Sequence, residues 1–167
     1  WSSDVCSSDL LATNSQRQLK FAVFLSGDSN YHIAGWRLPD SYADTGMNIQ
    51  RWIDLAKTME RGKLDMLFIA DSIGVGGVDN KVALRHSPLT DRLEPLTTLA
   101  ALSTVTTHVG LAATAHTTYN EPFHVARKFA SLDHLSGGRA GWNFVTGANR
   151  DNAFNFGHSE HPEHAKR

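Results

Sequence analysis

The sequence predicts an α/β fold, namely the N-terminal half of a (β/α)8 TIM barrel with about four βα units. Short apolar runs alternate with segments of helical periodicity, and the first three runs begin near residues 19, 64 and 109. Such alternation is typical of parallel strands joined by right-handed crossovers. The runs are apolar throughout, so both faces of the sheet are expected to be covered. A complete barrel needs about 250 residues, and the chain has 167.

The first two strands and the helix between them follow from local signals. An apolar run at residues 20–25 predicts the first strand, and a long polar loop follows it to residue 46. Asn48 is a favourable N-cap for a helix that carries Trp52 on its apolar stripe. Gly62 is expected to end that helix. The second strand is predicted at residues 64–70, with a loop rich in glycine and aspartate after it.

Two prolines mark the beginnings of the next helices. Pro95 and Pro122 suit the first turn of a helix, where the missing N–H costs no hydrogen bond. The third strand is predicted at residues 109–115 and the fourth at 140–145, after a helix that ends at Gly137. Asp133 and Arg139 are expected to form a fold-stabilising pair at this helix-to-strand turn. No Gly-x-Gly-x-x-Gly or Walker-type loop follows a strand, which favours the barrel over a nucleotide-binding open sheet.

Composition excludes several classes of function. The chain carries 16 basic and 17 acidic residues for a formal net charge of -1, so no strongly basic surface is expected to attract nucleic acid or an anionic membrane. No apolar stretch approaches the roughly 18 to 20 residues that a membrane-spanning helix needs. We therefore expect a cytoplasmic protein with neither a nucleic-acid nor a membrane partner.

The first ten residues, WSSDVCSSDL, are predicted to be a sequencing-adapter artefact. They repeat Ser-Ser-Asp, lack the apolar run of a secretory signal, and back-translate to a sequence that resembles a library adapter. The partial barrel domain is therefore expected at residues 11–167. The single cysteine, Cys6, lies within the ten residues, so no disulfide or thiol chemistry is expected.

Polar residues follow every predicted strand, where the active face of an α/β barrel lies. These side chains form hydrogen bonds and carry few permanent charges, which suits a neutral heterocycle with polar edges better than a polyanion. They are Tyr31, His32, Asp71, residues 114–118, Asn143, Thr146 and Asn149.

Four motifs give the chain a specific resemblance. GWRLPD at residues 35–40, DMLFIAD at 65–71 and LDHLSGGR at 132–139 resemble the bacterial luciferase-like flavin monooxygenases. GWNFVTG at 141–147 is similar to the subgroup of nitrilotriacetate, dibenzothiophene-sulfone and long-chain alkane monooxygenases. The resemblance implies a barrel that binds reduced FMN, supplied by a separate NADH-dependent flavin reductase. With dioxygen, the enzyme would oxidise a small organic or xenobiotic substrate in a pocket that excludes water. It also implies a homodimer, and the chain alone is expected to be inactive.

The resemblance assigns four cofactor-binding residues. Asp71 matches the acid that the family places beside the flavin ring, and Thr117 lies where the family has a Ser or Thr that contacts FMN. Asn143 matches the asparagine of the Gly-Trp-Asn motif. His164 matches the first position of a His-x-x-Arg-Tyr pattern near the FMN phosphate, and here the chain reads HAKR to its last residue.

Two histidines are the candidates for a catalytic or orienting group on the substrate side. His32 lies in the loop after the first strand and is the preferred candidate, and His86 in the next long loop is the second. Each has the alternative interpretation of a structural or surface histidine.

Three further functions stay open at this point. Nine histidines on a barrel, with His158, His161 and His164 at regular spacing, could belong to a metal-dependent hydrolase. The first strand has no His-x-His ending and no carboxylate joins the three at zinc-type spacing, so no metal site is predicted. The same fold would also suit a flavin-binding relative without catalytic activity or an enzyme that uses a deazaflavin.

Overall fold

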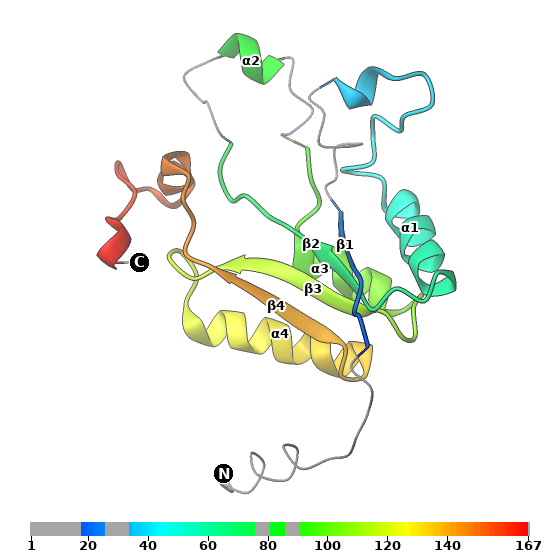
Figure 1. Ribbon diagram of the computed structural model, residues 1–167. Coiled ribbons are helices and arrows are strands. Elements are labelled where there is room, and N and C mark those ends of the chain that lie inside the picture. The colour runs from blue at the N-terminus through cyan, green and yellow to red at the C-terminus, as the bar shows by residue number, and fades with distance from the viewer. Residues whose placement is uncertain (1–17, 26–33, 76–80, 86–90, 167) are drawn as a thin grey trace, which may run out of the picture.

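The computed structural model describes residues 18–25, 34–75, 81–85 and 91–166 (Figure 1). Four parallel strands form one sheet in the order β1-β2-β3-β4. The strands are β1 (Ala22–Leu25), β2 (Met66–Ile69), β3 (Gly110–His116) and β4 (Ala140–Val145). The predicted α/β class and the half-barrel are confirmed. The predicted artefact at residues 1–10 lies outside the described residues.

Three helices connect consecutive strands, as predicted. They are α1 (Ile49–Arg61), α3 (Pro95–Ser103) and α4 (Pro122–Ser136). A short helix that the sequence did not predict, α2 (Lys81–Arg85), lies between β2 and α3. The described residues also form 3-10 helices that were not predicted, namely η2 (Gly35–Arg37), η4 (Arg150–Phe156) and η5 (His164–Lys166). None of the described helices is long and apolar enough to cross a membrane.

The helix ends follow the capping signals. Asn48 accepts a hydrogen bond from the N–H of Gln50 at 3.1 Å. α4 ends at Gly137, whose φ of 69° is the left-handed conformation that favours glycine. Gly62, however, has a right-handed conformation with φ of -75°, and the left-handed residue after α1 is Lys63 with φ of 55°. Gly62 is thus the C-cap of α1, as predicted, although Lys63 and not the glycine adopts the left-handed conformation.

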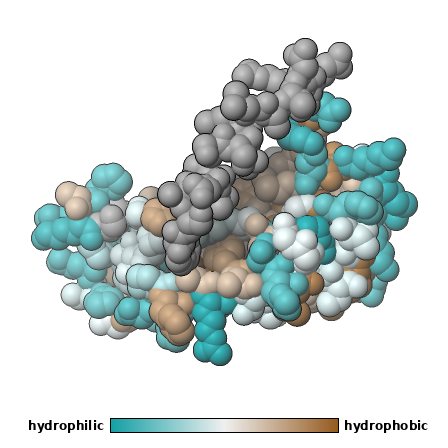
Figure 2. Space-filling model, turned by 90° about the horizontal axis from the view of Figure 1, so that it is seen from below, coloured by the Kyte–Doolittle hydropathy of each residue, from teal (hydrophilic) through white to brown (hydrophobic). Residues whose placement is uncertain are grey.

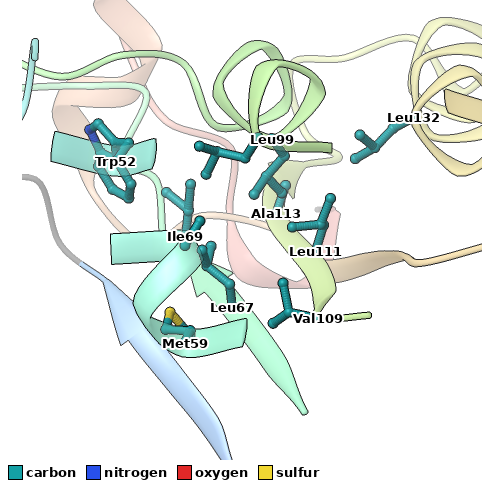
Figure 3. Close-up of a cluster of buried hydrophobic side chains, with 11 residues drawn as sticks. Trp52, Met59, Leu67, Ile69, Leu99, Val109, Leu111, Ala113 and Leu132 are labelled. Atoms are coloured by element: carbon teal, nitrogen blue, oxygen red, sulfur yellow. The ribbon is translucent and has the colours of Figure 1, made fainter. Parts of the chain in front are cut away.

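The apolar core lies between the helices and one face of the sheet. Leu67 and Ile69 of β2 and Leu111 of β3 pack there against Leu99 of α3 (Figure 3). Trp52 of α1 is only 3% exposed, which confirms that its stripe belongs to the core. Burying several side chains of this size is the main source of the fold's stability.

The opposite face of the sheet corresponds to the barrel interior, and in one register row its side chains become smaller from β1 to β4. The strand register aligns Phe24 with Phe68, Ala112 and Gly141. The rings of Phe24 and Phe68 lie 5.3 Å apart, whereas a Cβ on Gly141 would lie 3.1 Å from the Cβ of Ala112. Glycine at position 141 therefore avoids a close contact with Ala112 of the neighbouring strand. Figure 2, which views the molecule from below, shows apolar side chains exposed among hydrophilic ones.

Two side chains fasten the ends of the sheet where the strands begin. The Glu60 carboxylate accepts hydrogen bonds from the consecutive backbone N–H groups of Thr107, His108 and Val109. Partial burial opposes ionisation of Glu60, but these hydrogen bonds outweigh it and lower its pKa to about 2. The segment that leads into β3 is thereby tied to the last turn of α1.

The second of these side chains is Arg139. Its guanidinium donates to the carbonyl oxygens of Ser103, Thr106, Val109 and Ser136, and to the Thr106 hydroxyl. The expected pair with Asp133 is therefore not a direct one. Both groups stabilise the same turn, but Asp133 instead accepts a hydrogen bond from the N–H of Ala140 at 3.3 Å.

Candidate functional site

A cavity of about 570 Å³ lies at the carboxyl ends of β2, β3 and β4. Parallel strands bring the polar residues that follow them to the same edge, which is the active face of α/β barrels. The cavity brings together Asp71, Asn143 and His164, three of the four predicted cofactor-binding residues. Its lining is Ala70, Asp71, Thr114, His116, Asn143, Phe144, Val145, Thr146, Gly147, Ala148 and His164.

Asp71 follows β2 and is the one carboxyl group in the lining of this cavity. Burial raises its pKa above the ordinary 3.8. The electrostatic interaction with His116 and a hydrogen bond from the N–H of Ser72 lower this pKa, with smaller effect. The Asp71 carboxyl group is therefore less strongly acidic than an exposed one.

Asn143 and Thr114 form a side-chain pair across two neighbouring strands. They are register partners, and the Asn143 amide donates to the Thr114 hydroxyl at 2.9 Å. Thr114 is 4% exposed. The hydrogen bond fixes the amide orientation, and leaves one amide N–H and the carbonyl oxygen of Asn143 able to bond a ligand.

Thr117, the fourth predicted cofactor-binding residue, is not in the lining of this cavity. Its backbone N–H and its hydroxyl both lie near the carbonyl oxygen of Val145, at 2.9 and 3.4 Å. The next residue, Thr118, donates through its hydroxyl to the carbonyl oxygen of Thr146 at 2.6 Å. Both threonines thus attach the loop after β3 to the end of β4.

The C-terminal segment reaches the cavity through a contact that no sequence pattern indicated. The Tyr119 hydroxyl lies 2.6 Å from Nδ1 of His161, and Nε2 of His161 lies 3.3 Å from the carbonyl oxygen of Gly147. The ring of Phe156 stacks on Tyr119 with centroids 4.6 Å apart. Only an N–H can bond the Gly147 carbonyl, so in the neutral imidazole Nε2 donates to Gly147 and Nδ1 accepts from the Tyr119 hydroxyl. These contacts hold the segment that carries His164.

The spacing of His158, His161 and His164 does not produce a metal site in the described part of the chain. No group of three or more His, Cys, Asp or Glu side chains there could hold a metal ion. The His161 ring is instead engaged by Tyr119 and Gly147. The regular spacing of these three histidines therefore does not by itself form a metal site among the described residues.

The two predicted substrate-side histidines lie outside the described residues, and a further histidine lies in the cavity wall. His32 and His86 lie outside the described residues. His116 belongs to the polar range 114–118, but its sequence neighbourhood does not distinguish it from a structural histidine. The structure buries it in the cavity wall.

Comparison with known proteins supports the motif resemblance. The sequence profile described as luciferase-like monooxygenase matches residues 21–167. N-acetyl-S-(2-succino)cysteine monooxygenase of Bacillus subtilis (strain 168) is 53% identical over 152 residues, which make up 91% of this chain and 33% of that protein. Nitrilotriacetate monooxygenase component A of Aminobacter aminovorans is 47% identical over 163 residues, covering 94% of this chain and 35% of that protein.

Solved structures agree with the sequence relatives. The crystal structure of a long-chain alkane monooxygenase has a TM-score of 0.81 at 30% identity, covering 91% of this chain and 36% of that one. A riboflavin lyase, solved with modified FMN and riboflavin, has a TM-score of 0.77 at 34% identity and covers 86% of this chain and 33% of that one. The chain thus spans about a third of the length of these relatives. It belongs to the luciferase-like monooxygenase family.

Proposed function

We propose that the full-length protein carrying this chain is the oxygenase component of a two-component monooxygenase. It uses reduced FMN and dioxygen to oxidise a small organic or xenobiotic substrate. The observation that carries the proposal is the cavity at the ends of β2, β3 and β4, in which Asp71, Asn143 and His164 lie together. The relatives named as monooxygenases act on chemically diverse small molecules, which supports the reaction class and leaves the substrate to experiment.

The groups in the cavity fit a flavin. The isoalloxazine ring is flat and uncharged over most of its surface, with N–H and C=O groups along one edge. The cavity offers the Asn143 amide, the Thr114 hydroxyl and the Asp71 carboxyl, beside the apolar side chains of Ala70 and Val145. Neutral donors and acceptors with one carboxyl suit such a ring better than a highly charged ligand.

The proposed roles follow from the positions of the side chains. Asp71 and Asn143 would hold the polar edge of the flavin ring, and His164 would lie toward its phosphate. Thr117 would contribute indirectly, because its N–H and hydroxyl are directed to the carbonyl oxygen of Val145 at the end of β4. The bound FMN supplies the redox chemistry with dioxygen.

The chain's own contribution is to orient the ring. The Asn143–Thr114 hydrogen bond fixes the amide in one direction before a ligand arrives, which is the preorganisation that a binding site needs. Asp71 can hold a proton on its carboxyl oxygen more readily than an exposed aspartate, because burial raises its pKa. The Tyr119–His161 contact holds the C-terminal segment over the edge of the site.

Partners and substrate-side residues belong to the same proposal. One relative is named as component A of its monooxygenase, which supports a separate NADH-dependent flavin reductase as the source of reduced FMN. A cytoplasmic location, where NADH is available, and a homodimer complete the proposed assembly. His32 and His86 remain the proposed catalytic or orienting groups on the substrate side.

The test uses the full-length protein with a flavin reductase, NADH and FMN. Candidate substrates are chosen from the thioether, aminopolycarboxylate, sulfone and alkane classes. We expect product formation that requires the reductase and dioxygen, with one oxygen atom from ¹⁸O₂ in the product. FMN binding without oxygenation of any of these classes would indicate a non-catalytic relative. Tighter binding of a reduced deazaflavin than of reduced FMN would contradict the FMN assignment.

A further inference from the structure

His116 is the buried polar group of the cavity wall to which neither the motifs nor the relatives give a role. It is the last residue of β3, and its side chain is 5% exposed. Its backbone carbonyl accepts a hydrogen bond from the Asn120 amide at 2.7 Å, which fixes the end of the strand. A histidine this deeply buried must find partners on the strands beside it.

The imidazole ring reaches the end of β2 through one nitrogen. Nε2 lies 3.4 Å from the backbone carbonyl oxygen of Asp71. A carbonyl oxygen only accepts hydrogen bonds, so Nε2 is the nitrogen that carries the proton in this contact. The donated bond fixes the peptide unit of the residue whose carboxyl faces the cavity.

The other nitrogen faces the end of β4. A Cβ built on Gly147 would lie 3.0 Å from Nδ1 of His116 and 3.1 Å from the side-chain nitrogen of Asn152. Gly147 has φ of 77°, which favours glycine, so the backbone here both turns and leaves room for the ring. Nδ1 has no hydrogen-bond partner among the described residues. The imidazole is thus held on one side by a hydrogen bond, and on the other side it occupies the room that Gly147 leaves.

From these contacts we propose that His116 is a positioning residue for the flavin site, which holds Asp71 in place by donating from Nε2 to its backbone carbonyl. The inference rests on the proposed function, because it assigns the position of Asp71 to FMN binding. A substitute for His116 should therefore preserve FMN binding if it places an N–H where Nε2 lies. A substitute that places an N–H only where Nδ1 lies should weaken FMN binding. The role assigned to His116 is thus exerted through Asp71.

Glutamine and asparagine separate these two cases. The amide nitrogen of glutamine can take the place of Nε2, and that of asparagine reaches only about as far as Nδ1. Both variants remove the imidazole, and both leave a polar side chain in the wall. His134→Gln and His134→Asn, at the exposed end of α4, are the matched controls.

The experiment measures the dissociation constant of FMN by flavin fluorescence in the full-length protein, with thermal unfolding of each flavin-free variant alongside. We expect His116→Asn to bind FMN roughly three- to tenfold more weakly, with His116→Gln close to the unsubstituted protein and no change in the controls. Equal affinities for the two His116 variants, or failure of both to fold, would overturn the proposal. Failure of the unsubstituted protein to bind FMN would instead contradict the proposed function.

Discussion

The Asn143 amide donates a 2.9 Å hydrogen bond to the Thr114 hydroxyl across the neighbouring strands β4 and β3. Both side chains lie on the interior face of the sheet and line the cavity at its carboxyl end. The pair therefore links strand pairing to the site, because the register that aligns the two residues also fixes the direction of the amide.

Loss of the Thr114 hydroxyl should loosen Asn143 without changing the shape of the wall. Thr114→Val keeps the side-chain volume, so we expect a stability cost of about 1 kcal/mol and FMN binding weakened roughly three- to tenfold. Fluorescence titration and thermal unfolding of the full-length protein measure the two effects. Thr58→Val, on the exposed side of α1, is the control that also removes a hydrogen-bonded hydroxyl. Unchanged FMN affinity in Thr114→Val would show that the amide direction does not matter.

Substitution of Asp71 should separate stability from binding. Because burial raises its pKa, ionisation of Asp71 is disfavoured in the fold, and its contribution to stability falls as the pH rises through the folded-state pKa. Asp71→Asn removes that loss, so the variant should be at least as stable at pH 7, while FMN affinity or turnover falls roughly tenfold or more. Urea unfolding at pH 4 and pH 7, with FMN titration, measures both. A less stable variant with full FMN affinity would place Asp71 outside the site.

A side chain at Gly147 should disturb the cavity as well as strain the backbone. Gly147→Ala places a Cβ 3.0 Å from Nδ1 of His116, whereas Gly157→Ala, with a similar φ of 74°, meets nothing within 4 Å. Both variants carry the cost of an alanine in the left-handed region, about 1 kcal/mol. We expect Gly147→Ala to be the less stable of the two and to bind FMN more weakly. Equal losses in thermal unfolding and FMN titration would mean that the contact with His116 is unimportant.

The Glu60 contact should make stability depend on acid pH. Its folded-state pKa of about 2 lies below the ordinary 4.5, so the stabilisation is complete above about pH 4.5 and is lost as the pH falls toward 2. Because the carboxylate is partly exposed, we expect Glu60→Gln to cost about 1 to 2 kcal/mol at pH 7 and less at pH 3. Urea unfolding at the two pH values measures the difference. Glu163→Gln, at an exposed pair with Lys166, should have little effect at either pH.

Much of the fold could be predicted because its signals are local. The four strands, the Asn48 cap, the prolines at the beginnings of α3 and α4 and the left-handed Gly137 each depend on a few neighbouring residues. The left-handed Lys63 could not be predicted, because a glycine precedes it and is the residue that usually adopts that conformation.

The candidate site could be predicted only in part. Asp71 and Asn143 could be found because parallel strands end at one edge, a rule that needs no side-chain geometry. The contact of Tyr119 with His161 joins residues 42 positions apart, and the contact of His116 with Asp71 joins residues 45 apart. Neither contact follows from the periodicity of a helix or a strand. Both could therefore be identified only in the structure.

The most direct test of the central claim is a crystal structure of the full-length protein with FMN. We predict the isoalloxazine ring in the cavity at the ends of β2, β3 and β4, with its polar edge within hydrogen-bond distance of Asp71 and Asn143. A ring bound elsewhere, with both of these side chains out of contact with it, would contradict the assignment of this cavity as the flavin site.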